Sequence, residues 1–392
     1  MSCLFACSQI KKLNMRKHIE WLDGLKGVAI ALIVLGHVVA TVQNMAIQQS
    51  TRNVFEFMFH AIYSFHVQLF FVIAGITFSC RDGFGAFFRK KFFRLMVPYY
   101  VWGFASAILF IVMGQSVSGE VNAASSTAAF SGKTLVGEWW VPLVSVVHAG
   151  GWPNGKGFSF NGVLWFLPVL FVAEISFYWV AKIVKGRQGM MFCGFALSSV
   201  FLLYENPLIY GCRMPYGITW VPKYFPYLVL GYWFSSVRSI RDGKGICRDW
   251  WYVVASVMLA YCALVFCFPN LALGDARRYA REIAVAVGMI SVMIALAQRN
   301  VWRSFAFLAP MSLGIMLIHK FPLVAAQLLV WKLHLGLNAT WSSLILCATV
   351  FFALTLICYY ASKVIVYLFP WSLGAKVRER FPKKENESLF AN

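Results

Sequence analysis

Lys26 and His37 stand at the two ends of an apolar stretch near the N-terminus of the chain. They are eleven residues apart, which in an α-helix is roughly 16 Å along the axis and leaves them about 20° apart around it. A neutral imidazole can take up a proton near pH 7, and a lysine at the rim can hold an anion. Gly36, beside His37, leaves room for a substrate or a second helix to approach. The spacing predicts one helix with an anion-binding end and a basic imidazole deeper inside.

Each of these residues also has a structural interpretation. His37 could hydrogen-bond across to a neighbouring helix, and Lys26 could be an ordinary rim lysine whose head reaches the water. Asp23 precedes the same stretch, where it is either a substrate contact or the N-cap of the helix.

Three further ionisable residues lie in or beside apolar runs. His66 is thirteen residues before Ser79, or about 20 Å of helix, which places it at a depth close to that of His37. The two histidines could therefore share a cavity, although an interfacial position for His66 is also open. Glu174 lies in the middle of a run, where a charge costs about 2.5–3.5 kcal/mol, so we expect it to be protonated, paired or facing a polar cavity. His319 closes another run, near the predicted outer face, and is a weaker cavity candidate.

Lys91 and Arg94 form a basic pair three residues apart, which makes them neighbours on one helical face. Such a pair suits a polyanionic nucleotide. Membrane topology alone also places basic residues at such a position, and this second interpretation is favoured when the pair is taken by itself.

The elements that must position these residues are membrane helices. Of the 392 residues, 60% are hydrophobic and 13% are charged, whereas a soluble domain carries about 25% charged residues. The apolar runs do not alternate as barrel strands would, so we predict an all-α polytopic membrane bundle. Hydropathy indicates about ten transmembrane helices: Leu25–Ala40, Ala61–Ser79, Phe92–Gly114, Gly162–Val184, Gly189–Tyr204, Tyr224–Val237, Trp250–Phe268, Ile283–Gln298, Pro310–Trp331 and Trp341–Tyr367.

The net charge of +20 would suggest nucleic acid in a soluble protein. With the N-terminus placed in the cytoplasm, 25 of the 35 basic residues fall on the cytoplasmic side of the ten-span arrangement. This is the positive-inside pattern, so we expect no nucleic-acid partner and both termini in the cytoplasm. The predicted organisation is a basic N-terminal segment (1–24), a transmembrane domain (25–367) and a basic cytoplasmic tail (368–392). We expect no cleavable signal peptide, because the first apolar stretch is short and precedes the basic residues.

Motif searches exclude several kinds of site. The ten cysteines show no CxxC pairing and no metal-binding spacing with histidine, so we expect no metal. Those in apolar runs are expected to be small buried residues: Cys193, Cys262, Cys267, Cys347 and Cys358. A GxxxxGK match at 150–157 lacks the following Ser or Thr and lies in a predicted outer loop, so it is not a phosphate-binding loop.

Six segments in order along about residues 18–365 resemble the membrane acyltransferase-3 family, in particular its fucose 4-O-acetylase-like branch of sugar O-acetyltransferases. They are Trp21–Gly27 with Gly36-His37; Phe65-His66 with Leu69–Phe71 and Gly75; Arg94–Tyr99; Leu164–Leu167; Phe225–Tyr227 with Gly231-Tyr232; and Ser312–Ile315 with Ile318-His319. The chain departs from the family pattern at two places. Val67-Gln68 follow His66, where the family commonly has Met-Pro, and Met316 stands where the family often has Tyr.

The resemblance implies acyl transfer from cytoplasmic acyl-CoA, usually acetyl-CoA as co-substrate, to a hydroxyl of an envelope polysaccharide or lipid-linked sugar. It implies that His37 is the essential histidine, as general base or transient acyl carrier. Lys26, Lys91 and Arg94 would hold the CoA phosphates, and His66, Glu174, His319 and Asp23 are the candidate substrate contacts. No metal is needed, because a thioester is already activated. We expect the protein in the plasma (inner) membrane.

Two other classes of function compete with this interpretation. A transporter or flippase of an envelope glycan precursor would show paired inverted halves with broken helices at matching positions, and the sequence has no such pairing. A structural subunit of a partner enzyme would tolerate substitution of His37. The sequence leaves open the acceptor sugar, the acyl group and the oligomeric state.

Overall fold

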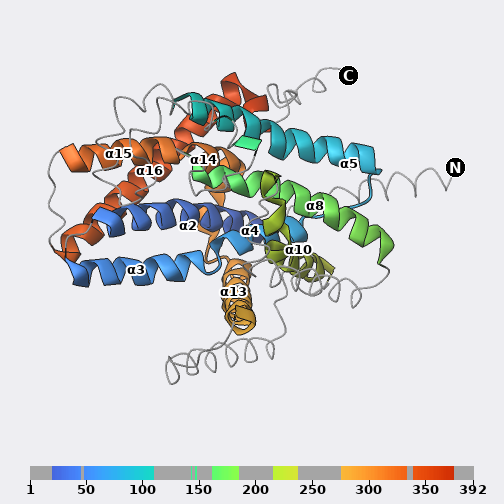
Figure 1. The fold of residues 1–392 in the computed structure, drawn as a ribbon, viewed down its shortest axis with the longest axis horizontal. Helices are drawn as coiled ribbons and strands as arrows, with labels where there is room; N and C mark the ends of the chain where they lie inside the picture. The colour runs from blue at the N-terminus through green and yellow to red at the C-terminus, as the bar shows by residue number, and fades with distance from the viewer. Residues whose placement is uncertain are drawn as a thin grey trace, which may run out of the picture.

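The computed structural model describes residues 20–45, 48–109, 143, 146–147, 161–184, 215–236, 275–332 and 339–374. In these parts of the chain every regular element is a helix, as predicted (Figure 1). The elements are α2 (Glu20–Met45), α3 (Gln49–Tyr63), α4 (His66–Ile76), α5 (Phe84–Lys91), the π-helical turn η1 (Phe92–Met96), η2 (Gly162–Trp165), α8 (Phe166–Ile183), η3 (Pro215–Trp220), α10 (Val221–Ser236), α13 (Asp275–Gln298), η4 (Arg303–Met311), α14 (Ser312–Ile318), α15 (Lys320–Lys332), α16 (Thr340–Leu368) and η5 (Pro370–Leu373).

Five described helical segments are long and apolar enough to cross a membrane. They are Trp21–Met45, Gln49–Ile76, Phe84–Leu109, Gly162–Ile183 and Thr340–Leu368. A sixth candidate is the pair Glu282–Gln298 and Arg303–Ile318, which bends by 107° at its break. The protein is therefore a helical membrane protein.

Only part of the ten-span arrangement can be compared with this structure. The predicted spans Gly189–Tyr204 and Trp250–Phe268 lie outside the described residues, as do most of the two terminal segments. The sixth predicted span corresponds to α10, whose 16 residues are fewer than a perpendicular crossing needs.

Several predicted boundaries were wrong. The second span begins at Gln49 instead of Ala61, because the amphipathic helix α3 continues into α4 through a short turn at 64–65. The predicted span Pro310–Trp331 is not one helix. It is divided among η4, α14 and α15, with His319 at the break between the last two.

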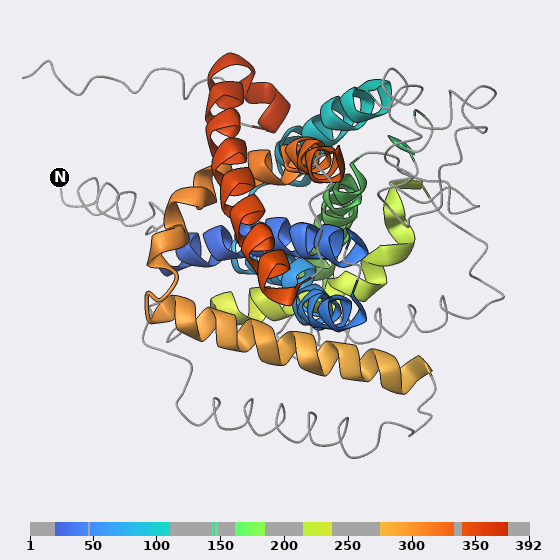
Figure 2. The same cartoon turned by 90° about the vertical axis from the view of Figure 1, so that its left-hand side faces the viewer.

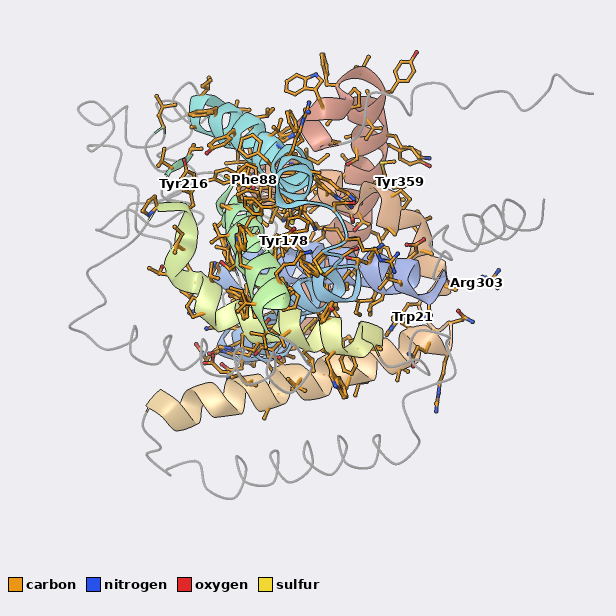
Figure 3. All side chains as sticks on the ribbon, turned by 90° about the vertical axis from the view of Figure 1, so that its right-hand side faces the viewer. Trp21, Phe88, Tyr178, Tyr216, Arg303 and Tyr359 are labelled. Atoms are coloured by element: carbon orange, nitrogen blue, oxygen red, sulfur yellow. The ribbon has the colours of Figure 1, made fainter. Side chains whose placement is uncertain are left out.

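Helix α2 lies at the centre of the described structure, with α3 beside it and α16 crossing it (Figures 1 and 2). Apart from Asp23, Lys26 and His37, its residues from Trp21 to Ala40 are apolar on every side, as expected for a helix surrounded by others. Leu25, Ile30 and Val39 are fully buried. The 3₁₀ segment η4 covers the N-terminal part of α2; in Figure 3, Trp21 lies at this end, beside η4, and Arg303 extends away from it.

Among the described elements, α4 and α10 pack most extensively against each other, and glycines make this packing possible. A Cβ on Gly75 would lie 2.1 Å from the carbonyl oxygen of Leu228, and one on Gly231 would lie 2.0 Å from that of Val72. Any side chain at either position would force the backbones apart. This close crossing fixes α4, and with it the start of α4, against α10.

Candidate active site

A cavity of about 410 Å³ lies where several helices begin, and His37 and His66 both line it. Helix α2 reaches the cavity with its second half, whereas α4, α8 and α10 reach it with their first residues. The predicted sharing of one cavity by His37 and His66 is therefore seen in the structure. The described lining residues are Ile33, His37, His60, Tyr63, Ser64, His66, Val67, Gln68, Phe70, Gly162, Val163, Trp165, Phe166, Lys223, Tyr224, Glu282 and Met316.

His37 is held by a tyrosine that the sequence interpretation missed. The Tyr63 hydroxyl and Nδ1 of His37 are 3.1 Å apart and share a hydrogen bond. Gly36 allows this contact, because a Cβ there would lie 3.1 Å from the Tyr63 ring. The space beside His37 is thus used by a neighbouring helix, which is one of the two uses expected of Gly36.

Two more imidazoles surround His37. His66 is 3% exposed, and its Nδ1 is 2.9 Å from the backbone oxygen of Ile62. His319 is fully buried, and its ring centroid lies 5.2 Å from that of His37. Its Nδ1 is 2.8 Å from the backbone oxygen of Met316. Carbonyl oxygens only accept, so in both neutral rings Nδ1 carries the hydrogen and Nε2 carries the lone pair.

Nε2 of His319 is buried and has no hydrogen-bond partner among the described residues. A buried acceptor without a partner is uncommon, and it calls for a donor that arrives from elsewhere. His37, His66 and His319 together with Tyr63 therefore form a polar cluster inside the bundle. We call it the histidine cluster.

Glu174 does not line the cavity. Its carboxylate accepts a hydrogen bond from Lys91 in an ion pair between α8 and the segment that begins with α5. The Glu174 side chain is 2% exposed and that of Lys91 is 19% exposed. Of the three states expected for Glu174, the structure shows the paired one, and this pairing also engages one of the lysines expected to bind phosphate.

Arg94 lies on the π-helical turn η1, one turn beyond Lys91, and its side chain is exposed. Short π-helical insertions recur at functional sites. Phe88 on α5 is partly exposed and contacts Phe171 on α8, with ring centroids 5.5 Å apart, and Tyr178 on α8 contacts Phe87 on α5, at 4.9 Å (Figure 3). There the Tyr178 hydroxyl donates a hydrogen bond of 3.1 Å to the backbone oxygen of Asp82.

Lys26 and Asp23 form an ion pair of 3.5 Å within the first part of α2. Their side chains are 30% and 27% exposed, and neither residue lines the cavity. Asp23 is not the N-cap, because α2 already begins at Glu20. The structure thus places Lys26 and Asp23 together at the opposite end of α2 from His37.

The sequence interpretation also missed a group of polar and aromatic residues that line the cavity, which we call the polar wall. It contains Gln68, Trp165, Tyr224 and an ion pair of 3.5 Å between Lys223 and Glu282. Gln68 was visible only as a departure from the family pattern, and Trp165 only as part of a motif. Lys223 and Glu282 begin apolar runs, where a charged residue is ordinary, so no sequence signal distinguished them.

The remaining sequence predictions concern cysteines and metals. Cys347 and Cys358 are buried in α16, as predicted, whereas Cys193, Cys262 and Cys267 lie outside the described residues. In the part of the chain that the structure describes, no three His, Cys, Asp or Glu side chains are grouped to hold a metal ion.

Comparison with known proteins gives one match. No curated protein and no solved structure matches the chain. The family model for the acyltransferase domain of the acyltransferase-3 type matches residues 19–361. This region contains His37, every described residue that lines the cavity, and the basic residues Lys26, Lys91 and Arg94. The ordered motifs and this match over most of the chain lead to one conclusion: the protein belongs to the acyltransferase-3 family of membrane acyltransferases.

Proposed function

We propose that the protein transfers an acetyl group from cytoplasmic acetyl-CoA to a hydroxyl of an envelope polysaccharide or lipid-linked sugar. The observation that carries this proposal is the histidine cluster at the cavity. His37 is partly accessible from a space that suits a small polar acceptor, and Tyr63 orients its ring. A buried polar group of this kind, deep in an apolar bundle, is the default candidate for chemistry.

His37 acts as the general base. In the tautomer that we propose, Nδ1–H donates to the Tyr63 oxygen, which leaves Nε2 free to accept the acceptor's hydroxyl proton. The hydroxyl oxygen then bonds to the thioester carbonyl carbon, and the carbon–sulfur bond breaks. The imidazolium returns its proton to the departing thiolate, so the products are the O-acetyl sugar and free CoA thiol.

A transient acetyl-His37 is the covalent variant of this route. In that variant Nε2 attacks the thioester and releases the CoA thiolate, and the sugar hydroxyl then takes the acetyl group from the imidazole. The two variants differ in one observable, because only the covalent route labels the protein when acetyl-CoA is supplied without an acceptor.

The start of α4 supports the carbonyl oxygen as its negative charge develops. The first N–H groups of a helix have no partner within the helix, and α4 has no side chain capping them. His66 and Gln68, both in its first turn, line the cavity. The N–H groups and the helix dipole therefore favour an oxyanion there.

The CoA phosphates bind at the other end of the bundle. Arg94 is exposed, and Lys26 is part-exposed beside Asp23, so both can reach a phosphate. Lys91 contributes mainly through its pair with Glu174, which holds the third candidate span against α8. The roughly 16 Å between Lys26 and His37 along α2 suits an extended pantetheine arm.

The proposed orientation follows from the charges. If the basic N-terminal side is cytoplasmic, the start of α2 faces the cytoplasm. The second half of α2 and the first residues of α4, α8 and α10, which line the cavity, then lie toward the opposite surface of the membrane. The donor then enters from the cytoplasm and the acceptor from the outside, with both termini in the cytoplasm and the protein in the plasma (inner) membrane.

The test is incubation of membranes containing the full-length protein with acetyl-labelled acetyl-CoA and a panel of glycans, some of them lipid-linked. Label in a glycan, absent from membranes without the protein, supports the proposal. Movement of a glycan across the membrane without label would instead indicate a transporter or flippase and would overturn it.

A further inference from the structure

The cavity is also lined by the polar wall, whose side chains the proposed mechanism does not use. Gln68 lines it and is only 8% exposed, and its Oε1 atom has no hydrogen-bond partner in the described part of the chain. A buried carboxamide oxygen without a donor is costly, so such a group is expected to meet a donor in the bound state.

Aromatic rings also belong to the polar wall. Trp165 and Tyr224 both line the cavity, and their ring centroids are 5.5 Å apart at 37°. Their faces combine apolar surface with polar edges, which suits a ring that has C–H bonds on its face and hydroxyls around its rim.

The charges that line the cavity are balanced. Among the described lining residues, Lys223 is the one lysine or arginine and Glu282 is the one carboxylate, and they are paired at 3.5 Å. Lys223 also lies over the ring of Trp220, at 5.8 Å from its centroid. A ligand that carries its own charge would find no uncompensated partner on this wall, so desolvating that charge would weaken its binding.

From this wall we infer that the acceptor is a neutral pyranose, with its ring against Trp165 and a hydroxyl donating to Gln68, and that the Lys223–Glu282 pair discriminates against anionic sugars. This inference rests on the proposed function, because it names the acceptor for the same cavity. It assigns recognition to residues outside the histidine cluster.

The experiment measures equilibrium binding of sugars to the purified full-length protein in lipid nanodiscs, with no donor present. The probes are the methyl glycosides of galactose and glucose, each compared with its own uronide, which differs by one carboxylate. The variants are Gln68→Met, which keeps the side-chain length, and Glu282→Gln. Gln49→Met is the matched control, because Gln49 is exposed at the start of α3 and does not line the cavity.

The wild type is expected to bind at least one neutral glycoside about 5-fold or more tightly than the matching uronide. Gln68→Met is expected to weaken neutral binding by about 3- to 10-fold, whereas Gln49→Met leaves it unchanged. Glu282→Gln leaves Lys223 uncompensated and is expected to narrow the preference for the neutral sugar by about 5-fold. Thermal midpoints of all variants establish that each one is folded.

Equal binding of a uronide and its neutral partner by the wild type would overturn the inference, as would neutral binding that is unchanged in Gln68→Met. Absence of binding for both neutral glycosides would also overturn it. The same preparations are then supplied with labelled acetyl-CoA. The expected binding pattern without acetyl transfer would support this recognition wall while refuting the proposed reaction, so the two failures are distinguishable.

Discussion

Replacing Tyr63 with phenylalanine removes one atom, the hydroxyl that is 3.1 Å from Nδ1 of His37. If His37 is the base, its ring is neutral before reaction and positively charged in the transition state. A hydrogen bond contributes about 0.5–1.5 kcal/mol between neutral groups and about 1.5–3 kcal/mol when one partner is charged. The difference, roughly 1–1.5 kcal/mol, is the part that affects the chemical step.

That difference corresponds to a fall in kcat of about 5- to 12-fold for Tyr63→Phe. The KM for acetyl-CoA is expected to change little, because the donor's phosphates are held far from Tyr63. The assay is transfer of labelled acetyl in nanodiscs over a range of both substrates. Tyr100→Phe is the matched control: it removes the 2.9 Å hydrogen bond to Tyr216, which does not line the cavity.

A second readout separates orientation of His37 from simple packing. Nitrogen NMR of labelled histidine should show that the His37 tautomer equilibrium is altered in Tyr63→Phe and unaltered in Tyr100→Phe. An unchanged kcat, or an equal loss of kcat in both variants, would refute the proposed role of the Tyr63 hydroxyl in orienting the base.

Three other predictions follow from the packing and charges. Lys91→Met leaves Glu174 buried without its partner and should lower the free energy of unfolding by about 3–5 kcal/mol. Thermal unfolding measures this loss, and the double variant Lys91→Met with Glu174→Gln should recover much of it. Gly231→Ala forces a Cβ against the backbone of α4 and should cost about 3 kcal/mol or more, whereas Gly85→Ala, with nothing within 4 Å, should be nearly neutral. Arg94→Ala should raise the KM for acetyl-CoA about 10-fold, less so at high salt, with a small change in kcat.

Each of these has a contrary result. A Lys91→Met protein that is as stable as wild type but binds acetyl-CoA poorly would assign Lys91 to the donor instead of to Glu174. Equal stability of the two glycine variants would contradict the close crossing of α4 and α10. An Arg94→Ala protein with an unchanged KM at low salt would remove Arg94 from the donor site.

The meeting of His37 and His66 could be predicted because it depends on local geometry. The number of residues between each histidine and the end of its span gives its depth, and adjacent antiparallel spans lie side by side. The sequence marked His319 only as a weaker cavity candidate near the predicted outer face. That residue lies at the break between α14 and α15, and the fold directs it inward against His37.

Other features depend on contacts distant in sequence. Tyr63 is the last residue of α3, just before the turn into α4, and it hydrogen-bonds to His37. Hydropathy predicted a single span that begins only at Ala61, so it did not reveal α3 as a separate helix. The pairing of Lys91 with Glu174 joins two segments 83 residues apart, so the sequence indicated only that each charge needed an explanation. Periodicity and composition carry no information on such pairs, whereas they were sufficient for the all-helical membrane fold.

The central claim is that His37 performs the chemistry. The measurement is acetyl transfer by His37→Gln in nanodiscs, together with the binding of acetyl-CoA and of a neutral glycoside to the same preparation. We expect a fall in kcat of about 100-fold or more with both substrates still bound, because a general base contributes about 10²- to 10⁴-fold. A His37→Gln protein that binds both substrates and transfers acetyl at the wild-type rate would contradict the account.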